Sequence, residues 1–150
     1  MILASPVWKV MFDPQSRFKE ATEKEVRFLD DDPDMLLLLL RIAHLQFQEL
    51  PSSLTYRQLL GLAALCDKYD TVHLARPWLR QWEQPRSSPT NCFQQENSIF
   101  IAWTFGDVET FEKWAKHLAM ECYTTPTPGQ CCIRPGVQLK ENMPPGIVGL

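Results

Sequence analysis

The chain has 150 residues, 45% of them apolar, and a formal net charge of −3, so it is long enough for one domain with a buried core. This composition excludes a chain disordered throughout, and the charge offers no basic patch of the kind that binds nucleic acid. The longest apolar run, Met35 to Leu40, is too short to cross a bilayer, and no secretory signal pattern opens the chain, so we expect no membrane partner.

The first predicted element is a short helix over residues 5–12. Ser5 is a good N-cap, Pro6 suits the first helical position, and Asp13-Pro14 ends the helix. The next apolar pattern, Glu25 to Leu29, roughly alternates and predicts a short strand. One strand cannot satisfy its own backbone, so its partners are either weak segments such as 46–50 or missing from this chain.

The strongest helix signal lies in residues 30–45. Asp30-Asp31-Asp32 precede Pro33, which gives an acidic cap followed by proline at the first helical position. A cation site is the alternative interpretation of these acids, and a cap is the simpler one. The consecutive leucines 36–40 leave no polar face, so we expect Met35 to Leu45 to form the central buried helix.

Residues 55–82 predict a pair of helices with one apolar face. Thr55 and Gln58 match a capping box, and an apolar stripe continues from Leu59 to Tyr69. Asp70 or Thr71 then caps a second helix, which Pro77 must kink or restart. Cys66 lies on the apolar side of the first helix, where it behaves as a small buried hydrophobe rather than a nucleophile. The polar end 67–70 is expected to be solvated.

The remaining third of the chain predicts a linker, two helices and a tail. Residues 84–96 are polar and contain prolines, which indicates a linker. A helix begins at Asn97 and runs through Trp103 until Gly106 stops it, and Asp107 caps another helix over 108–121. Residues 123–150 are rich in proline and glycine and are expected to form loops.

No pattern in the chain predicts a catalytic, metal or cofactor site. Nucleotide-binding, zinc-protease and hydrolase motifs are absent, and the five cysteines and three histidines have spacings that suit zinc poorly. We therefore expect a protein that is not an enzyme and uses no cofactor, metal or small-molecule substrate. The odd number of irregularly spaced cysteines favours a reduced compartment, either the cytoplasm or the nucleus.

Four segments together resemble the BTB/POZ domain: LASPVWKVMF, RFKE, EVRFLDDDPDMLLLLLRIAHLQ and TYRQLLGLAALCDKYDTVHLARPWLRQW. The match is closest to uncharacterised fungal proteins with a BTB domain, and IFIAWTFGDVETFEKWAKHL resembles the helical segment that follows in that group. The resemblance covers residues 3 to about 122 and rests on the order and spacing of these segments. It implies an α+β, predominantly α fold with a small remnant of sheet.

The resemblance also implies a division of the chain. Residues 1–83 would be a partial BTB/POZ core, 84–96 a linker, 97–122 a helical pair and 123–150 the tail. A complete domain begins with a strand, a helix and a hairpin ahead of LASPVW, and these elements carry most of the family's homodimer interface. We expect them to be lacking here, so the chain is expected to be truncated.

The function implied is protein–protein interaction. Such a module would associate with itself, recruit a cullin-type ubiquitin ligase scaffold or anchor a transcriptional assembly. The alternative is a degenerate fragment, or the product of an erroneous gene model, without independent function. The expected surface lies where the missing elements would pack, with Trp8 as its anchor. Family analogy implies a second, cullin-facing surface that involves Phe12, the segment 46–50 and the start of the helix that Thr55 opens. The candidate interface residues are Ile2, Leu3, Val7, Trp8, Met11, Phe12, Phe47 and Glu49.

Overall fold

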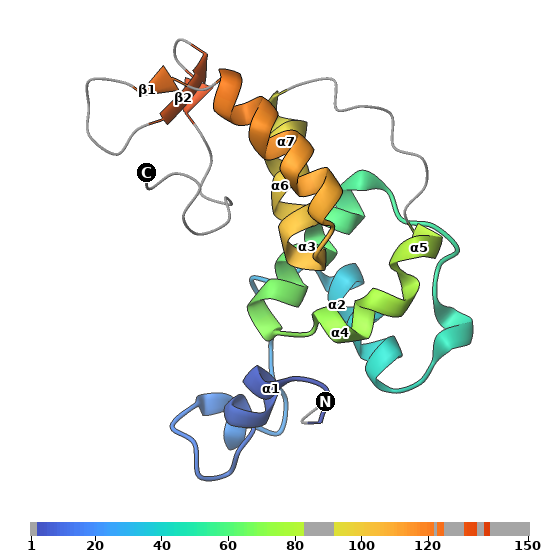
Figure 1. Cartoon of the computed structure of the whole chain (residues 1–150). Coiled ribbons are helices and arrows are strands. Elements are labelled where there is room, and N and C mark those ends of the chain that lie inside the picture. The colour runs from blue at the N-terminus through green and yellow to red at the C-terminus, as the bar shows by residue number, and fades with distance from the viewer. Residues whose placement is uncertain (1–2, 83–91, 122, 125–130, 135–136, 139–150) are drawn as a thin grey trace. The chain divides into compact units, whose positions relative to one another are not determined.

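The computed structural model describes residues 3–82, 92–121, 123–124, 131–134 and 137–138, and it gives side chains for residues 3–82 and 96–120 (Figure 1). The chain divides into two compact units, Met1–Gln84 and Pro85–Leu150. The described part is predominantly helical, as predicted. Ile2, and the part of the predicted linker from residue 84 to residue 91, lie outside the described residues.

The first unit is a set of helices centred on α2. α2 packs against α3 and α4, as the apolar pattern predicted, and α1 packs against α3. Gly61 of α3 allows a close approach of the two central helices, because a side chain there would stand 3.3 Å from Cγ of Met35. The elements are α1 (Pro6–Met11), η1 (Lys19–Ala21), α2 (Pro33–Ala43), η2 (Phe47–Glu49), α3 (Tyr56–Tyr69), α4 (Val72–Ala75), η3 (Arg76–Trp78) and α5 (Leu79–Trp82).

Three helices of this unit begin directly after the capping residues that the sequence predicted. Ser5 Oγ accepts a hydrogen bond from the backbone N–H of Trp8 at 3.0 Å. Asp32 Oδ1 accepts from the N–H groups of the first turn of α2. Thr55 and Gln58 form the complete capping box. Each cap satisfies backbone donors that have no partner inside the helix, which fixes the starting residue.

The ends of α2 and α3 are set by residues with left-handed backbone. Leu45 has φ of 60° and Asp70 has φ of 50°. After Leu45 the N–H of Gln46 returns to the carbonyl of Arg41 at 2.8 Å, which completes a Schellman motif. Asparagine and aspartate tolerate this conformation, whereas a leucine side chain crowds the following carbonyl. Leu45 is also 74% exposed, so burial does not compensate that crowding.

Replacing Leu45 with glycine is therefore expected to stabilise the protein. Glycine adopts positive φ without steric crowding, and we expect a gain of roughly 0.5–1 kcal/mol in the free energy of unfolding after its larger unfolded-state entropy is deducted. Urea unfolding measures the change, with Leu45→Ala as the control that keeps a Cβ at the same backbone angles. A less stable Leu45→Gly variant would show that the leucine side chain packs against the protein.

The leucine run of α2 is buried on one side only, which corrects the prediction of a helix buried all round. Leu36, Leu38 and Leu39 are at most 8% exposed, whereas Leu37 is 47% exposed. Two neighbouring helices cover a stripe of α2 rather than its circumference. A run of identical residues carries no periodicity, so the sequence could not indicate which leucine faces water.

The strand predicted at Glu25 to Leu29 does not form. The described residues there are turns and irregular backbone, and no strand pairs with them. Alternation over five residues is a weak signal when no second strand of the same unit supplies hydrogen bonds. The prediction that Pro77 restarts its helix is confirmed, because the 3₁₀ turn η3 separates α4 from α5 there. Thr71 precedes α4 without a side-chain capping bond.

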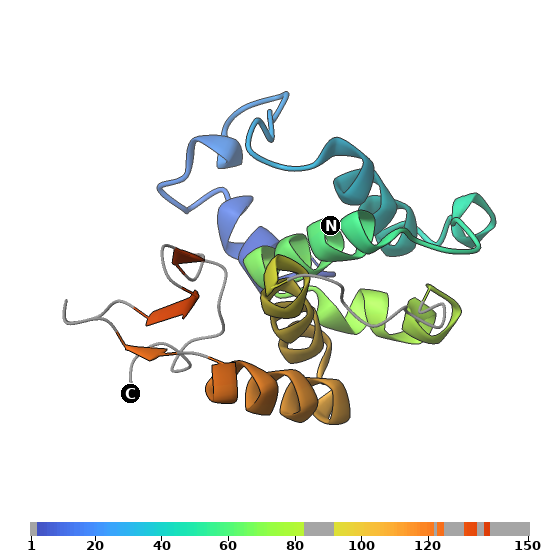
Figure 2. The same cartoon turned by 90° about the horizontal axis from the view of Figure 1, so that it is seen from above.

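The second unit contains two helices that lie side by side, α6 (Cys92–Phe105) and α7 (Val108–Glu121) (Figures 1 and 2). Gly106, with φ of 76°, ends α6, and Asp107 caps α7 by accepting from the N–H of Thr110 at 3.1 Å. The bounds of α7 match the prediction. α6 begins at Cys92, five residues before the predicted Asn97, so the end of the predicted linker is helical.

Three short strands follow α7, which corrects the prediction that residues 123–150 form only loops. They pair antiparallel in the order β1-β2-β3. Local pairing satisfies backbone groups even where the sequence has little to pack. The strands are β1 (Tyr123–Thr124), β2 (Cys131–Arg134) and β3 (Val137–Gln138).

Candidate functional site

Trp8, the predicted anchor of an exposed surface, is buried. Its side chain is 0% exposed, and its ring centroid lies 5.2 Å from that of Tyr69. The hydroxyl of Ser5 donates to the backbone carbonyl of Tyr69, which holds α1 against the end of α3. Trp8 therefore belongs to the core, and the prediction that it is exposed is wrong. Residues of the first unit itself supply its cover.

The opposite side of α1 carries the exposed apolar residues. Leu3 is fully exposed, Val7 is 39% exposed and Val10 is 57% exposed. Val7 and Val10 are three residues apart and lie along one side of α1, and Leu3 lies in the turn before the N-cap Ser5. We call these three residues the α1 face. Val10 was not among the predicted interface residues, although its spacing from Val7 is the signal that indicates it. Met11 and Phe12 are half-buried.

Phe47 and Glu49 lie on a different element from the α1 face. The Phe47 ring centroid is 5.3 Å from that of Trp78, and the side chain remains 45% exposed. Glu49 Oε2 lies 3.6 Å from Nη2 of Arg41, and its carbonyl accepts from Nη1 of the same arginine at 3.2 Å. η2 packs against α2, whereas α1 packs against α3. The predicted interface residues therefore divide into two groups.

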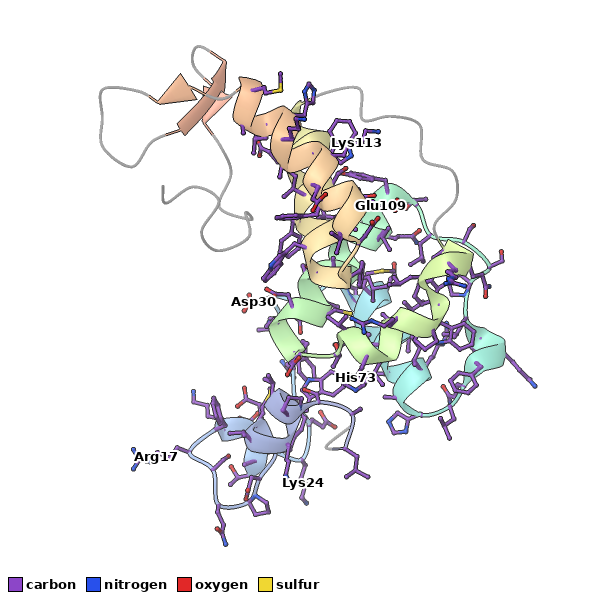
Figure 3. The ribbon with its side chains drawn as sticks, viewed as in Figure 1. Arg17, Lys24, Asp30, His73, Glu109 and Lys113 are labelled. Atoms are coloured by element: carbon purple, nitrogen blue, oxygen red, sulfur yellow. The ribbon has the colours of Figure 1, made fainter. Side chains whose placement is uncertain are left out.

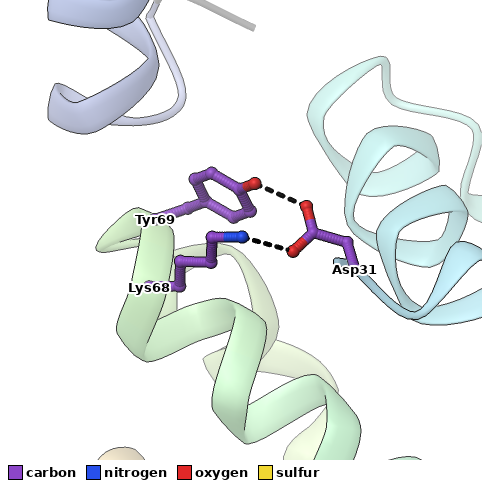
Figure 4. Close-up of polar contacts among 3 residues, drawn as sticks. All are labelled: Asp31, Lys68 and Tyr69. Carbon is purple, nitrogen blue, oxygen red and sulfur yellow. Dashed lines mark hydrogen bonds and ion pairs between the residues drawn. The ribbon is translucent and has the colours of Figure 1, made fainter. Parts of the chain in front are cut away.

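A polar cluster joins the loop before α2 to the end of α3 (Figure 4). Asp31 Oδ1 lies 2.7 Å from Nζ of Lys68, and Oδ2 accepts the hydroxyl hydrogen of Tyr69. The Asp31 side chain is only 2% exposed, and that of Lys68 is 48% exposed. The prediction of a solvated end at residues 67–70 is confirmed for Asp67, Lys68 and Asp70, which are exposed, and is wrong for Tyr69, which is buried. The neighbouring aspartates have different roles: Asp32 caps α2, and Asp31 makes this tertiary contact.

The electrostatics of the cluster suit attachment rather than acid–base catalysis. Burial, followed by the hydrogen bond to Asp31, raises the pKa of Tyr69 to about 12. The hydrogen bond to Asp31 also raises the pKa of Lys68. Both groups hold their protons at neutral pH, so neither is a general base, and a base must titrate near the working pH. The cluster can hold two segments together, and it provides no activated nucleophile.

Replacing Lys68 with methionine is expected to lower the free energy of unfolding by about 1–2 kcal/mol. The substitution leaves the carboxylate of Asp31 buried without its cation, and an unpaired buried charge is more costly than an absent pair. The double variant Lys68→Met/Asp31→Asn is expected to be more stable than Lys68→Met alone. Chemical unfolding of both variants measures the difference, and an equal loss in the two would contradict the argument.

Alkaline pH is expected to destabilise the protein. Burial raises the pKa of the Cys66 thiol from 9.0 to about 12, and the pKa of Tyr69 rises from 10.0 to about 12. The unfolded chain loses these protons first, so the stabilisation is complete below pH 9 and is lost as the pH rises from 9 to 12. Urea unfolding across this pH range should show that the free energy of unfolding decreases. In the Cys66→Ala variant the decrease that begins near pH 9 should be smaller. Constant stability would refute it.

Among residues 3–82 and 96–120, no group of three or more His, Cys, Asp or Glu side chains is placed to hold a metal ion. None of the described helices is both long and apolar enough to cross a membrane. The exposed apolar residues of the first unit are therefore its best candidates for a functional role.

Comparison with known proteins gives no assignment. The chain matches no protein-family model, no curated protein and no solved structure.

Proposed function

We propose that the chain is a protein–protein interaction module of BTB/POZ type that associates with itself or with a protein partner through the α1 face. As an adaptor, such a module would connect a cullin-type ubiquitin ligase scaffold or a transcriptional assembly to another protein. The sequence resemblance and the predominantly helical architecture support this proposal.

The observation that carries the proposal is the two-sided apolar character of α1. One side buries Trp8 in the core, and the other presents the α1 face to solvent. A six-residue helix with no packing requirement on its outer side has no structural need for two valines there. Exposed apolar residues that gather on one face are typical of interaction sites, whereas scattered ones are not.

The test compares the full chain with a Val7→Gln/Val10→Gln variant. Both positions are exposed, so the fold should tolerate the change, and thermal unfolding checks that it does. Sedimentation is measured at about 1 M salt, where the Debye length is about 3 Å and apolar contacts remain. We expect self-association of the wild type and its loss in the variant. The matched control is Lys9→Gln, which changes an exposed residue of the same helix.

Two results would count against the proposal. A wild type that remains monomeric and does not bind a hydrophobic dye would show that the α1 face is covered. A chain that melts without cooperativity would instead favour the alternative of a fragment without independent function, because a packed domain of this size unfolds as a unit.

A further inference from the structure

One end of the first unit gathers the end of α2, η2 and α5. Phe47 contacts Trp78, as described above, and Nε1 of Trp82 donates to the carbonyl of Pro51 at 2.9 Å. Arg41, in the last turn of α2, is bound to Glu49 of η2. Segments separated in sequence, 41–51 and 76–82, therefore meet at this end, which we call the basic end.

The basic end carries an excess of positive charge. Its two segments contain three arginines and one glutamate. Arg41 is engaged by that glutamate, whereas Arg76 and Arg80 are exposed and have no ion-pair partner among the described residues. These two arginines flank Trp78 in the sequence. Exposed unpaired charge of one sign selects partners of the opposite sign and accelerates their approach.

The same end presents exposed apolar side chains. Leu45 is 74% exposed with a crowded backbone angle, and Phe47 is 45% exposed two residues later. The positive φ of this leucine is unfavourable, and because the side chain is exposed, burial of apolar surface does not offset that cost. Strained backbone angles cluster at functional sites, which makes Leu45 a candidate contact residue. The basic end therefore has an apolar centre beside unpaired arginines.

The other end of the unit has the complementary composition. Segments 28–34 and 67–71 contain six aspartates and one lysine, and the bond between Asp31 and Lys68 places the two segments together. Asp30, which Figure 3 labels, and Asp34 are both exposed. Leu29 stands beside them and is 86% exposed. The segment Leu29–Asp34 thus offers an apolar residue followed by acidic ones.

We propose that the basic end of one molecule binds the segment Leu29–Asp34 of a second copy. Leu29 meets Leu45 and Phe47, and Asp30 and Asp34 pair with Arg76 and Arg80. The inference rests on the proposed interaction function but uses a surface separate from the α1 face. The two ends are different surfaces, so the contact is heterologous and adds molecules head to tail rather than closing a two-fold dimer.

The test uses the full chain with the Val7→Gln/Val10→Gln change, so that association through the α1 face does not contribute. At about 0.01 M salt, where the Debye length is about 30 Å, this protein is expected to form oligomers that grow with concentration, and about 1 M salt should disperse them. Two derivatives are then made from it. One adds Asp30→Asn/Asp34→Asn and the other adds Arg76→Gln/Arg80→Gln, so each neutralises one end.

Each derivative alone is expected to be monomeric, and an equimolar mixture is expected to form a dimer and nothing larger. Only one intact pair of ends remains in the mixture, so growth must stop there. Glu23→Gln/Glu25→Gln, which removes the same charge from exposed positions elsewhere, should leave the oligomers unchanged. Leu45→Gly should weaken association about tenfold without loss of stability, so misfolding cannot explain the effect.

Several outcomes overturn the proposal without affecting the proposed function. Oligomers that persist at high salt would come from another contact. The same conclusion would follow if both neutralised derivatives still formed oligomers on their own. A parent protein that is monomeric at low salt would also refute it, even where the wild type associates at high salt through the α1 face. A wild type that does not associate at high salt would contradict the role of the α1 face, but it would not affect this test, which measures association at low salt.

Discussion

Replacing Leu38 with aspartate is expected to lower the free energy of unfolding by about 4 kcal/mol, which is a large part of the stability of a domain of this size. Leu38 is 4% exposed in α2, the helix that contacts both α3 and α4. The substitution removes apolar contacts and places a carboxylate at a position that is shielded from water. Urea unfolding followed by circular dichroism measures the loss.

The neighbouring residue provides the control for this prediction. Leu37 is 47% exposed, so Leu37→Asp places the same charge on the same helix in contact with water. We expect a change within about 0.5 kcal/mol for this variant. Equal losses at the two positions would show that helix propensity or net charge, rather than burial, determines the effect, and α2 would then not be the centre of the unit.

Replacing Trp8 with alanine is expected to cost about 3–5 kcal/mol, because the residue is 0% exposed and fills the space between α1 and Tyr69. Trp8→Phe should cost much less. The indole Nε1 is buried without a hydrogen-bond partner, and its removal relieves a penalty of about 1–3 kcal/mol that partly offsets the lost volume.

Thermal unfolding separates this prediction from an interface role for Trp8. An anchor at an interface would change the sedimentation of the protein when truncated and leave its melting temperature nearly unchanged. A core residue changes the melting temperature in both the monomer and any oligomer. Lys9→Ala, at the exposed next position, should leave both quantities unchanged.

Local signals predicted most of the helical structure. Ser5, Asp32, Thr55 and Asp107 each cap the helix that the sequence assigned to them, because a cap depends on residues within one turn. Leu45 was placed inside a helix, since nothing local indicates that a leucine adopts positive φ. The start of α6 was missed because the prolines and polar residues around it indicated a linker, although the sequence carries a cap pattern there, Asn91 followed by Gln94.

Contacts between distant residues were not predictable. The bond between Tyr69 and Asp31 joins residues 38 positions apart, and no pattern in either segment indicates the other. The side of α1 that faces the core was assigned wrongly for a related reason. Apolar residues occupy both sides of this helix, so periodicity could not distinguish Trp8 from Val7 and Val10. Only the packing against α3 resolves that choice.

Tyr69 has a consequence for the order of events in folding. Its carbonyl accepts from Ser5 across 64 residues, and its hydroxyl binds Asp31 across 38. Closing such long loops is entropically expensive, so these contacts form after the local pairing of α2 with α3. The segment before α2 is consequently the last region to become protected from hydrogen exchange during refolding. In the native protein it is also the first to open, and the rate of that opening sets how often the indole of Trp8 meets solvent.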